Sequence, residues 1–181
     1  MPDMNTLAHG FDVKAIRAAA ANLDDGAVTD GYEADREAVI RMLNDALATE
    51  LVCVLRYKRH YYMASGINAG PVAAEFLQHA NEEMAHADLV AARITQLQGE
   101  PNFNPKGLAE RSHAEYVEGS SLVEMIKEDL VAERVAIASY QEIVRWLGLD
   151  DPTTRGMLEG ILAMEEEHAD DLVNLLKKLG S

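Results

Sequence analysis

The 181-residue sequence is poor in cysteine and in basic residues. Its single cysteine, Cys53, cannot form a disulfide within the chain, which favours a reducing compartment. Its 16 lysines and arginines stand against 31 aspartates and glutamates, for a net charge of −15. A surface this acidic repels nucleic acid and attracts cations, so we expect no nucleic-acid partner.

Long hydrophobic runs are also missing. No apolar stretch approaches the roughly 18 residues that a membrane-spanning helix requires, and the N-terminus has neither the basic start nor the apolar core of a signal peptide. We therefore expect a cytoplasmic protein without a membrane partner. Hydrophobic residues make up 48% and charged residues 26% of the sequence, which is typical of one well-cored globular domain.

Four stretches carry apolar residues at every third or fourth position, the spacing of an amphipathic helix. They run over 34–64, about 71–98, 121–147 and 152 to about 179. The connection over 99–120 is far longer than a tight turn needs and can run the length of a helix of about 40 Å. The sequence thus predicts an all-α fold, a four-helix bundle at 34–181 with one long crossover between the second and third helices, preceded by an acidic arm at 1–33.

A Glu-x-x-His pattern occurs twice, at Glu83 to His86 and at Glu165 to His168. This spacing places a carboxylate and an imidazole on one face of a helix. A lone glutamate inside an apolar helical stripe precedes each copy, 33 residues before Glu83 and 32 residues before Glu165. The six candidate ligands are therefore Glu50, Glu83, His86, Glu133, Glu165 and His168.

Taken singly, each of these glutamates is an ordinary solvated residue, and each histidine is an ordinary hydrogen-bonded one. As a set they lie near the midpoints of four apolar stripes, where a packed core favours leucine. Burial of uncompensated carboxylates costs several kcal/mol per charge, and two divalent ions would compensate four of them. The pattern indicates a dinuclear carboxylate centre for iron or manganese, with zinc as a further alternative.

Two pairs of residues near these ligands have two interpretations each. Tyr57 and Tyr140 follow Glu50 and Glu133 by seven residues, and they are either core aromatics or groups that contact the ligands. Glu82 and Asp129 are either exposed charges or acceptors that orient the imidazoles.

The stretch Glu83-Met84-Ala85-His86-Ala87-Asp88, with Gly99-Glu100-Pro101-Asn102 after it, resembles the second helix of bacterioferritin and its exit. The resemblance to the ferritin-like superfamily covers about 34–180. It implies a ferroxidase centre that binds two iron ions per chain, oxidises Fe(II) with dioxygen or hydrogen peroxide and serves iron storage. In the centre that this resemblance implies, Glu50 and His86 would be terminal ligands of one iron, and Glu133 and His168 would be terminal ligands of the other. Glu83 and Glu165 would bridge the two irons.

The same resemblance bears on haem and on assembly. Met84 coincides with the methionine that holds haem b between paired bacterioferritin subunits; its other interpretation is a packing residue. Only 13 residues follow His168, too few for the fifth helix at the four-fold axis of bacterioferritin. Dps-like ferritins also lack that helix and form dodecamers. We therefore expect a homo-oligomer, a dodecamer in preference to a 24-mer, with a dimer as the remaining alternative.

Two other functions fit the same ligands. One is a rubrerythrin-like protein that reduces peroxide, although the sequence has no Cys-x-x-Cys pair for the rubredoxin-type iron site of a complete rubrerythrin. The other is a non-catalytic bundle or encapsulated cargo that its metals only stabilise. A measurement of how much iron mineral the protein stores distinguishes both of these functions from iron storage.

Overall fold

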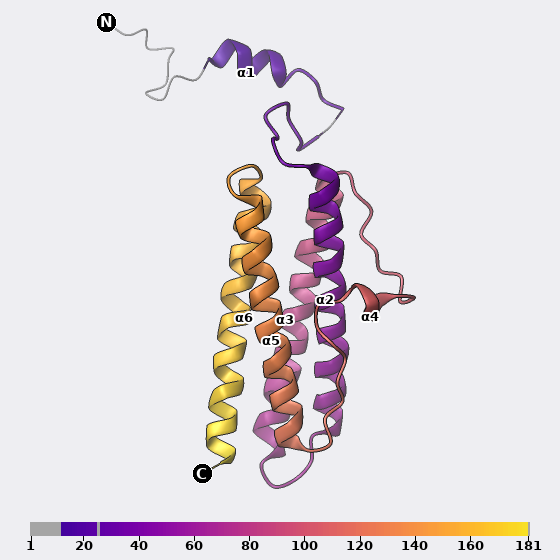
Figure 1. Ribbon diagram of the computed structural model, residues 1–181, viewed down its shortest axis with the longest axis vertical. Helices are drawn as coiled ribbons and strands as arrows, with labels where there is room; N and C mark the ends of the chain where they lie inside the picture. The colour runs from indigo at the N-terminus through magenta and orange to yellow at the C-terminus, as the bar shows by residue number, and fades with distance from the viewer. Residues whose placement is uncertain (1–11, 25, 181) are drawn as a thin grey trace, which may run out of the picture.

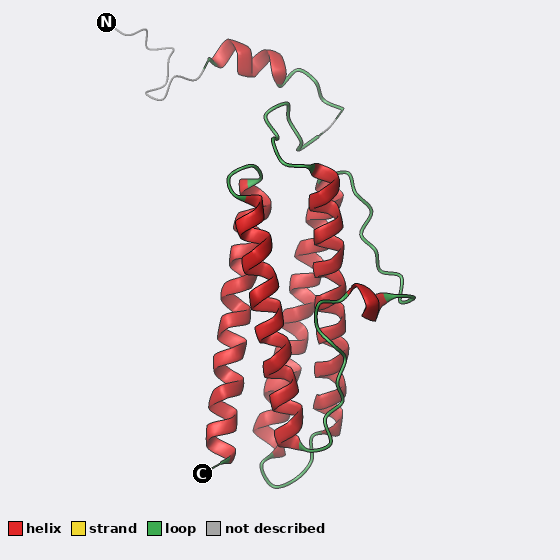
Figure 2. Ribbon diagram, viewed as in Figure 1, coloured by secondary structure: helices red, strands yellow, loops and turns green. Residues whose placement is uncertain are grey.

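The long helices lie side by side, and one long connection runs along them (Figures 1 and 2). The structure is a computed structural model, and it describes residues 12–24 and 26–180. Its helices are α1 (Val13–Ala19), α2 (Arg36–Met63), α3 (Ala69–Gln96), α4 (Leu108–Arg111), α5 (Leu122–Leu147) and α6 (Pro152–Leu179). The all-α prediction is confirmed, and the long helices form the predicted bundle. None of the helices in the described ranges is long and apolar enough to cross a membrane.

Side-chain caps set the starts of the long helices. Asp35 caps α2 by accepting a hydrogen bond from the amide of Ala38, and Asp151 caps α6 in the same way. Ser121 caps α5 by accepting from the amide of Glu124. The Glu124 carboxylate in turn accepts a hydrogen bond from the amide of Ser120, the residue before the cap.

The end of α3 brings the chain against α2. Gln98 has a positive φ of 63°, which turns the backbone out of the helix. At the next position, a Cβ on Gly99 would lie 2.8 Å from a side-chain carbon of Ile40 on α2. Glycine at 99 therefore permits a close approach that any larger residue would prevent.

The crossover is held to α2 by side chains that take up its backbone groups. The helices α2 and α3 pack as one pair and α5 and α6 as another, and the connection carrying α4 runs from one end of the bundle to the other (Figure 1). The backbone amides of Asn102 and His113 donate to Asn44 Oδ1 (2.7 Å) and Thr49 Oγ1 (2.9 Å) on α2. In the other direction, Arg56 and His60 of α2 donate to the backbone carbonyls of Glu115 (2.8 Å) and Glu118 (3.0 Å). These hydrogen bonds replace the partners that an irregular segment lacks.

A layer of polar side chains divides the buried core in two. The first apolar cluster contains Leu43, Leu47, Ile94, Leu147, Leu158 and Ile161 among others. The second contains Cys53, Tyr57, Phe76, Ala80, Ile126 and Leu172 among others. On every long helix the candidate ligands fall between the residues of these two clusters. The bundle thus supplies an apolar wall above and below the polar layer.

The described residues of the predicted arm at 1–33 differ in how closely they pack against the bundle. Its residues 1–11 and 25 lie outside the described residues. No residue of α1 is buried. Val28 and Tyr32, in contrast, pack against the first apolar cluster, and the Tyr32 hydroxyl donates to Asp151 at 2.9 Å. The last part of the arm therefore contacts the end of its own bundle.

Candidate metal centre

The six side chains expected as ligands converge in the polar layer, and none is more than 5% exposed. Helix α2 contributes Glu50 and α5 contributes Glu133. The other two long helices contribute two residues each, Glu83 and His86 from α3 and Glu165 and His168 from α6. All four helices of the bundle therefore build the site.

These residues form two groups in which one potential ligand atom per residue lies within 4.8 Å of the others. The first group is Glu50, Glu83, His86 and Glu165; the second is Glu83, Glu133, Glu165 and His168. Glu83 and Glu165 belong to both groups. The arrangement can hold two ions that share two carboxylates, with one further glutamate and one histidine for each ion.

Both imidazoles present Nδ1 to the carboxylates. His86 Nδ1 lies 2.9 Å from Glu165, 3.3 Å from Glu83 and 3.5 Å from Glu50. His168 Nδ1 lies 3.6 Å from Glu83, 3.8 Å from Glu165 and 3.9 Å from Glu133.

A carboxylate outside the six residues orients His168. His168 Nε2 donates to Glu82 at 2.9 Å, which leaves the Nδ1 lone pair for the interior of the site. Glu82 thus makes the imidazole contact that the sequence left open.

Two buried tyrosines fix the outer carboxylates. Tyr57 on α2 donates to Oε1 of Glu133 on α5, and Tyr140 on α5 donates to Oε1 of Glu50 on α2. Burial, together with the neighbouring carboxylates, raises the pKa of both hydroxyls well above the ordinary value, so both remain protonated donors. Each bond occupies one carboxylate oxygen and leaves the other for the centre.

Several polar atoms of the site are buried without a hydrogen-bond partner. They are Glu50 Oε2, Glu83 Oε1, Glu133 Oε2, both carboxylate oxygens of Glu165 and His168 Nδ1. A buried polar atom left in this condition costs about 1–3 kcal/mol. Because all of them belong to one cluster of ligand type, divalent cations would satisfy them together, and the residues present fit such ions.

The electrostatics of the cluster also favour cations. Burial raises the pKa of Glu83 well above the ordinary carboxyl value, and the charges of Glu165, Glu133 and Glu50 raise it further. Burial alone would lower the pKa of His86, but the close carboxylates of Glu165, Glu50 and Glu83 outweigh burial and raise this pKa to about 12. Divalent cations compete with protons for such a cluster, so binding of metal releases protons.

The donor set restricts the metal. Carboxylate oxygens and imidazole nitrogens suit iron, manganese and zinc, whereas softer ions prefer thiolates. The single thiol, Cys53, packs in the second apolar cluster and does not belong to either group of candidate ligands.

Asp129 is neither exposed nor bound to a candidate ligand, so both interpretations of this residue are wrong. It is buried and accepts hydrogen bonds from Arg56 Nε and His60 Nδ1, both at 2.8 Å. Arg56 and His60 also bind the backbone of the crossover. Asp129 therefore helps to hold the crossover against the bundle, through partners that the sequence pattern did not identify.

His79 is a buried neighbour of the site that the sequence pattern also did not identify. Its ring stacks on that of His168 with centroids 4.1 Å apart, and its Nδ1 lies 3.2 Å from the Tyr57 hydroxyl. His79 lies one helical turn before Glu83 on the same face of α3, and this spacing could have identified it from the sequence.

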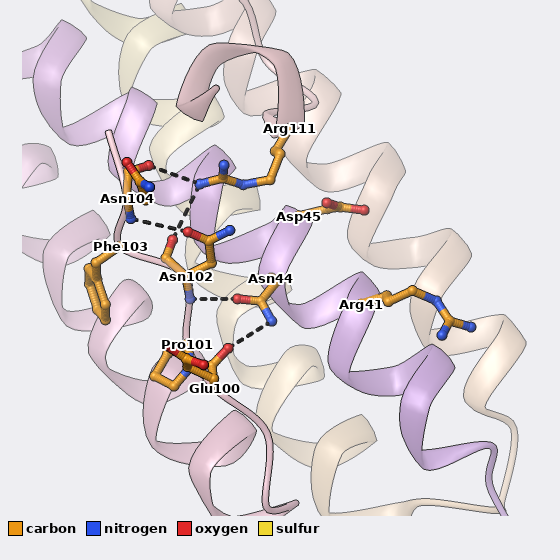
Figure 3. Close-up of a pocket in the computed structure, with 9 residues that line it drawn as sticks. All are labelled: Arg41, Asn44, Asp45, Glu100, Pro101, Asn102, Phe103, Asn104 and Arg111. Atoms are coloured by element: carbon orange, nitrogen blue, oxygen red, sulfur yellow. Dashed lines mark hydrogen bonds between the residues drawn. The ribbon is translucent and has the colours of Figure 1, made fainter. Parts of the chain in front are cut away.

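A surface pocket of about 750 Å³ lies away from this centre, between α2 and the crossover (Figure 3). Asn44, Asn102, Asn104 and Arg111 line it, and hydrogen bonds connect them to one another and to the backbone. These bonds shape the first part of the crossover. None of the six candidate ligands lines the pocket.

Comparisons with known proteins agree with this geometry. The ferritin-like domain family model matches residues 40–181. Bacterioferritin from Mycobacterium bovis is 32% identical over 146 residues, covering 78% of this chain and 87% of that protein.

Two solved structures extend the agreement to the fold. A dodecameric thioferritin, the bacterioferritin-related protein from Bacteroides fragilis, superposes with a TM-score of 0.78 at 34% identity, over 82% of this chain and 89% of that chain. The bacterioferritin of Desulfovibrio desulfuricans, whose diiron site was studied in different catalytic states, gives a TM-score of 0.71 at 26% identity, over 80% and 81%. The chain belongs to the ferritin-like family.

Proposed function

We propose that the protein oxidises Fe(II) and sequesters the product, with Glu50, Glu83, His86, Glu133, Glu165 and His168 as the iron ligands. The observation that carries this proposal is the pair of ligand groups that share Glu83 and Glu165. Two shared carboxylates hold two ions about 3.5–4 Å apart, a spacing at which both can react with one oxidant. The likeness to bacterioferritins supports iron as the metal.

The reaction balances for either oxidant. Two Fe(II) ions give one electron each, and the pair reduces dioxygen with two protons to hydrogen peroxide, or hydrogen peroxide with two protons to two waters. Iron is the substrate, and the chain binds and positions it. Tyr57 and Tyr140 hold the outer carboxylates, and Glu82 holds His168. We place this activity in the cytoplasm, where Cys53 remains reduced.

The test is an aerobic Fe(II) titration that follows the absorbance of Fe(III). Oxidation should show a fast phase that saturates near about two irons per chain. Glu83→Ala and His168→Ala should lose this phase, whereas Glu167→Ala, at an exposed neighbour on α6, should keep it. If the first two variants oxidise Fe(II) as fast as the unmodified protein, the ligand assignment is wrong. Repeating the titration anaerobically with peroxide identifies the oxidant.

We infer that the chain assembles as a homo-oligomer, a dodecamer in preference to a 24-mer or a dimer. The likeness to a dodecameric relative supports this size. Light scattering coupled to gel filtration measures it, and a stable monomer at micromolar concentration would refute assembly altogether.

Haem binding is tested by the absorption spectrum of the same purified oligomer. Met84, the residue that the resemblance connects with haem, is 40% exposed on α3. A haem absorption band in the purified oligomer, absent from Met84→Leu, assigns Met84 as a haem ligand. If the purified oligomer shows no haem band, Met84 is a packing residue.

A further inference from the structure

Three side chains outside the six-residue centre gather between α3 and α6. His79 Nε2 lies 3.4 Å from Glu75 and 4.0 Å from Asp171. His79 is fully buried, while the side chains of Glu75 and Asp171 are 27% and 42% exposed. The group therefore has a buried imidazole at its base and two carboxylates that reach solvent.

The hydrogen bonds of His79 leave a lone pair facing these carboxylates. The Tyr57 hydroxyl gives its proton to Glu133, so it can only accept from His79 Nδ1–H. With the ring proton on Nδ1, Nε2 carries the lone pair. Nε2 is buried and has no hydrogen-bond partner. A lone pair that faces two carboxylates is stabilised by a cation between them.

The distances suit a metal ion. Metal bonds to imidazole nitrogen and carboxylate oxygen are about 2.0–2.2 Å long, so two ligands of one ion lie roughly 3–4.4 Å apart. The separations of 3.4 and 4.0 Å fall within this range. The exposed sides of Glu75 and Asp171 leave room for water as a further ligand.

We propose that Glu75, His79 and Asp171 bind a third divalent cation in each chain, at a site separate from the six-residue centre. One imidazole with two carboxylates suits Fe(II), Mn(II) or Zn(II). His79 joins the two sites: Nε2 is the ligand here, and its ring stacks on His168. A cation at this site lies on the solvent side of His79.

The test uses Zn²⁺, which takes no part in redox chemistry, in the intact protein. Calorimetric titration is carried out in excess Mg²⁺, which prefers oxygen ligands and suppresses weak binding at exposed carboxylates. The protein should bind about three Zn²⁺ per chain, and the double variant Glu75→Gln with Asp171→Asn should bind about two. The matched control is Asp88→Asn with Asp170→Asn, which removes the same charge from exposed positions on the same helices and should still bind about three.

The location is checked by zinc-edge anomalous scattering from crystals of the loaded protein. A peak within bonding distance of His79 Nε2 that the double variant lacks supports the site. The proposal is overturned if the double variant binds as many Zn²⁺ as the control, or if the unmodified protein binds only about two. Since Zn²⁺ is not oxidised, loss of the third ion and loss of Fe(II) oxidation are separate outcomes.

Discussion

Tyr140 on α5 donates a hydrogen bond to Glu50 on α2, although the two residues are 90 positions apart. The reverse bond runs from Tyr57 on α2 to Glu133 on α5. Each tyrosine lies two helical turns beyond the glutamate of its own helix but binds the glutamate of the other helix. The pair of bonds therefore ties α2 to α5 at the candidate centre and fixes both outer carboxylates.

Removal of one of these hydroxyls should weaken binding of one ion. Loss of a group that orients a ligand typically lowers metal affinity about 10- to 100-fold. We expect Tyr140→Phe to reduce affinity at the Glu50 side by this factor, and Tyr57→Phe to do the same at the Glu133 side. Zn²⁺ titration measures both. Tyr62→Phe, at a residue 78% exposed, is the control and should bind like the unmodified protein. Unchanged affinity in both test variants would show that the hydroxyls do not position the ligands.

Removal of metal should lower stability, because the buried carboxylates then lose the cations that compensate them. A ligand at 100 times its dissociation constant stabilises the folded state by about 2.7 kcal/mol. At about 2–4 °C per kcal/mol for a chain of this size, Zn²⁺ should raise the unfolding temperature by roughly 5–10 °C over protein in excess chelator. Differential scanning calorimetry measures the shift. An equal rise in a Glu83→Ala with Glu165→Ala variant would place the stabilising ions elsewhere.

Asp129→Ala should destabilise the fold strongly. The substitution leaves the buried Arg56 guanidinium and the His60 imidazole without their carboxylate partner. Breaking a buried ion pair in this way costs about 3–5 kcal/mol. Urea denaturation followed by circular dichroism measures the loss. Asp170→Ala, at an exposed position on α6, should change the unfolding free energy by less than about 0.5 kcal/mol. A similar loss in both variants would contradict the role of the buried pair.

The contribution of Asp151 should depend on pH. Burial raises its pKa, but hydrogen bonds from Thr154 and Tyr32 and the charge of Arg93 outweigh burial and hold this pKa below its usual value. Stabilisation by the carboxylate is therefore complete above the unfolded-state pKa of about 3.9 and is lost as pH falls through the lower folded-state pKa.

The corresponding variant is Asp151→Asn. It should be less stable than the unmodified protein by about 1–2 kcal/mol at pH 7, because asparagine still caps the helix but lacks the charge that strengthens the bonds to Arg93, Thr154 and Tyr32. This difference should stay constant down to about pH 5 and shrink below about pH 4. Urea denaturation across this range tests it, and a difference that grows on acidification would reverse the sign argued here.

The sequence by itself determined the helices and the candidate ligands. Apolar spacing and the long connection at 99–120 were sufficient to predict the bundle, because each is a local property of the chain. The spacing from Glu83 to His86 and from Glu165 to His168 likewise fixes which side chains share one face of a helix. Helices that bury such faces turn them toward one common core.

Contacts between helices were decided only by the tertiary structure. The bond from Arg56 to Asp129 joins residues 73 positions apart, and the contact of His79 with Asp171 joins α3 to α6. Such pairs depend on the axial register and rotation of one helix against another, which follow from the packing of whole helix surfaces. A shift by one turn, about 5.4 Å, keeps every helical pattern but moves Tyr140 away from Glu50. Local spacing therefore identifies the residues of a face, and packing selects their partners.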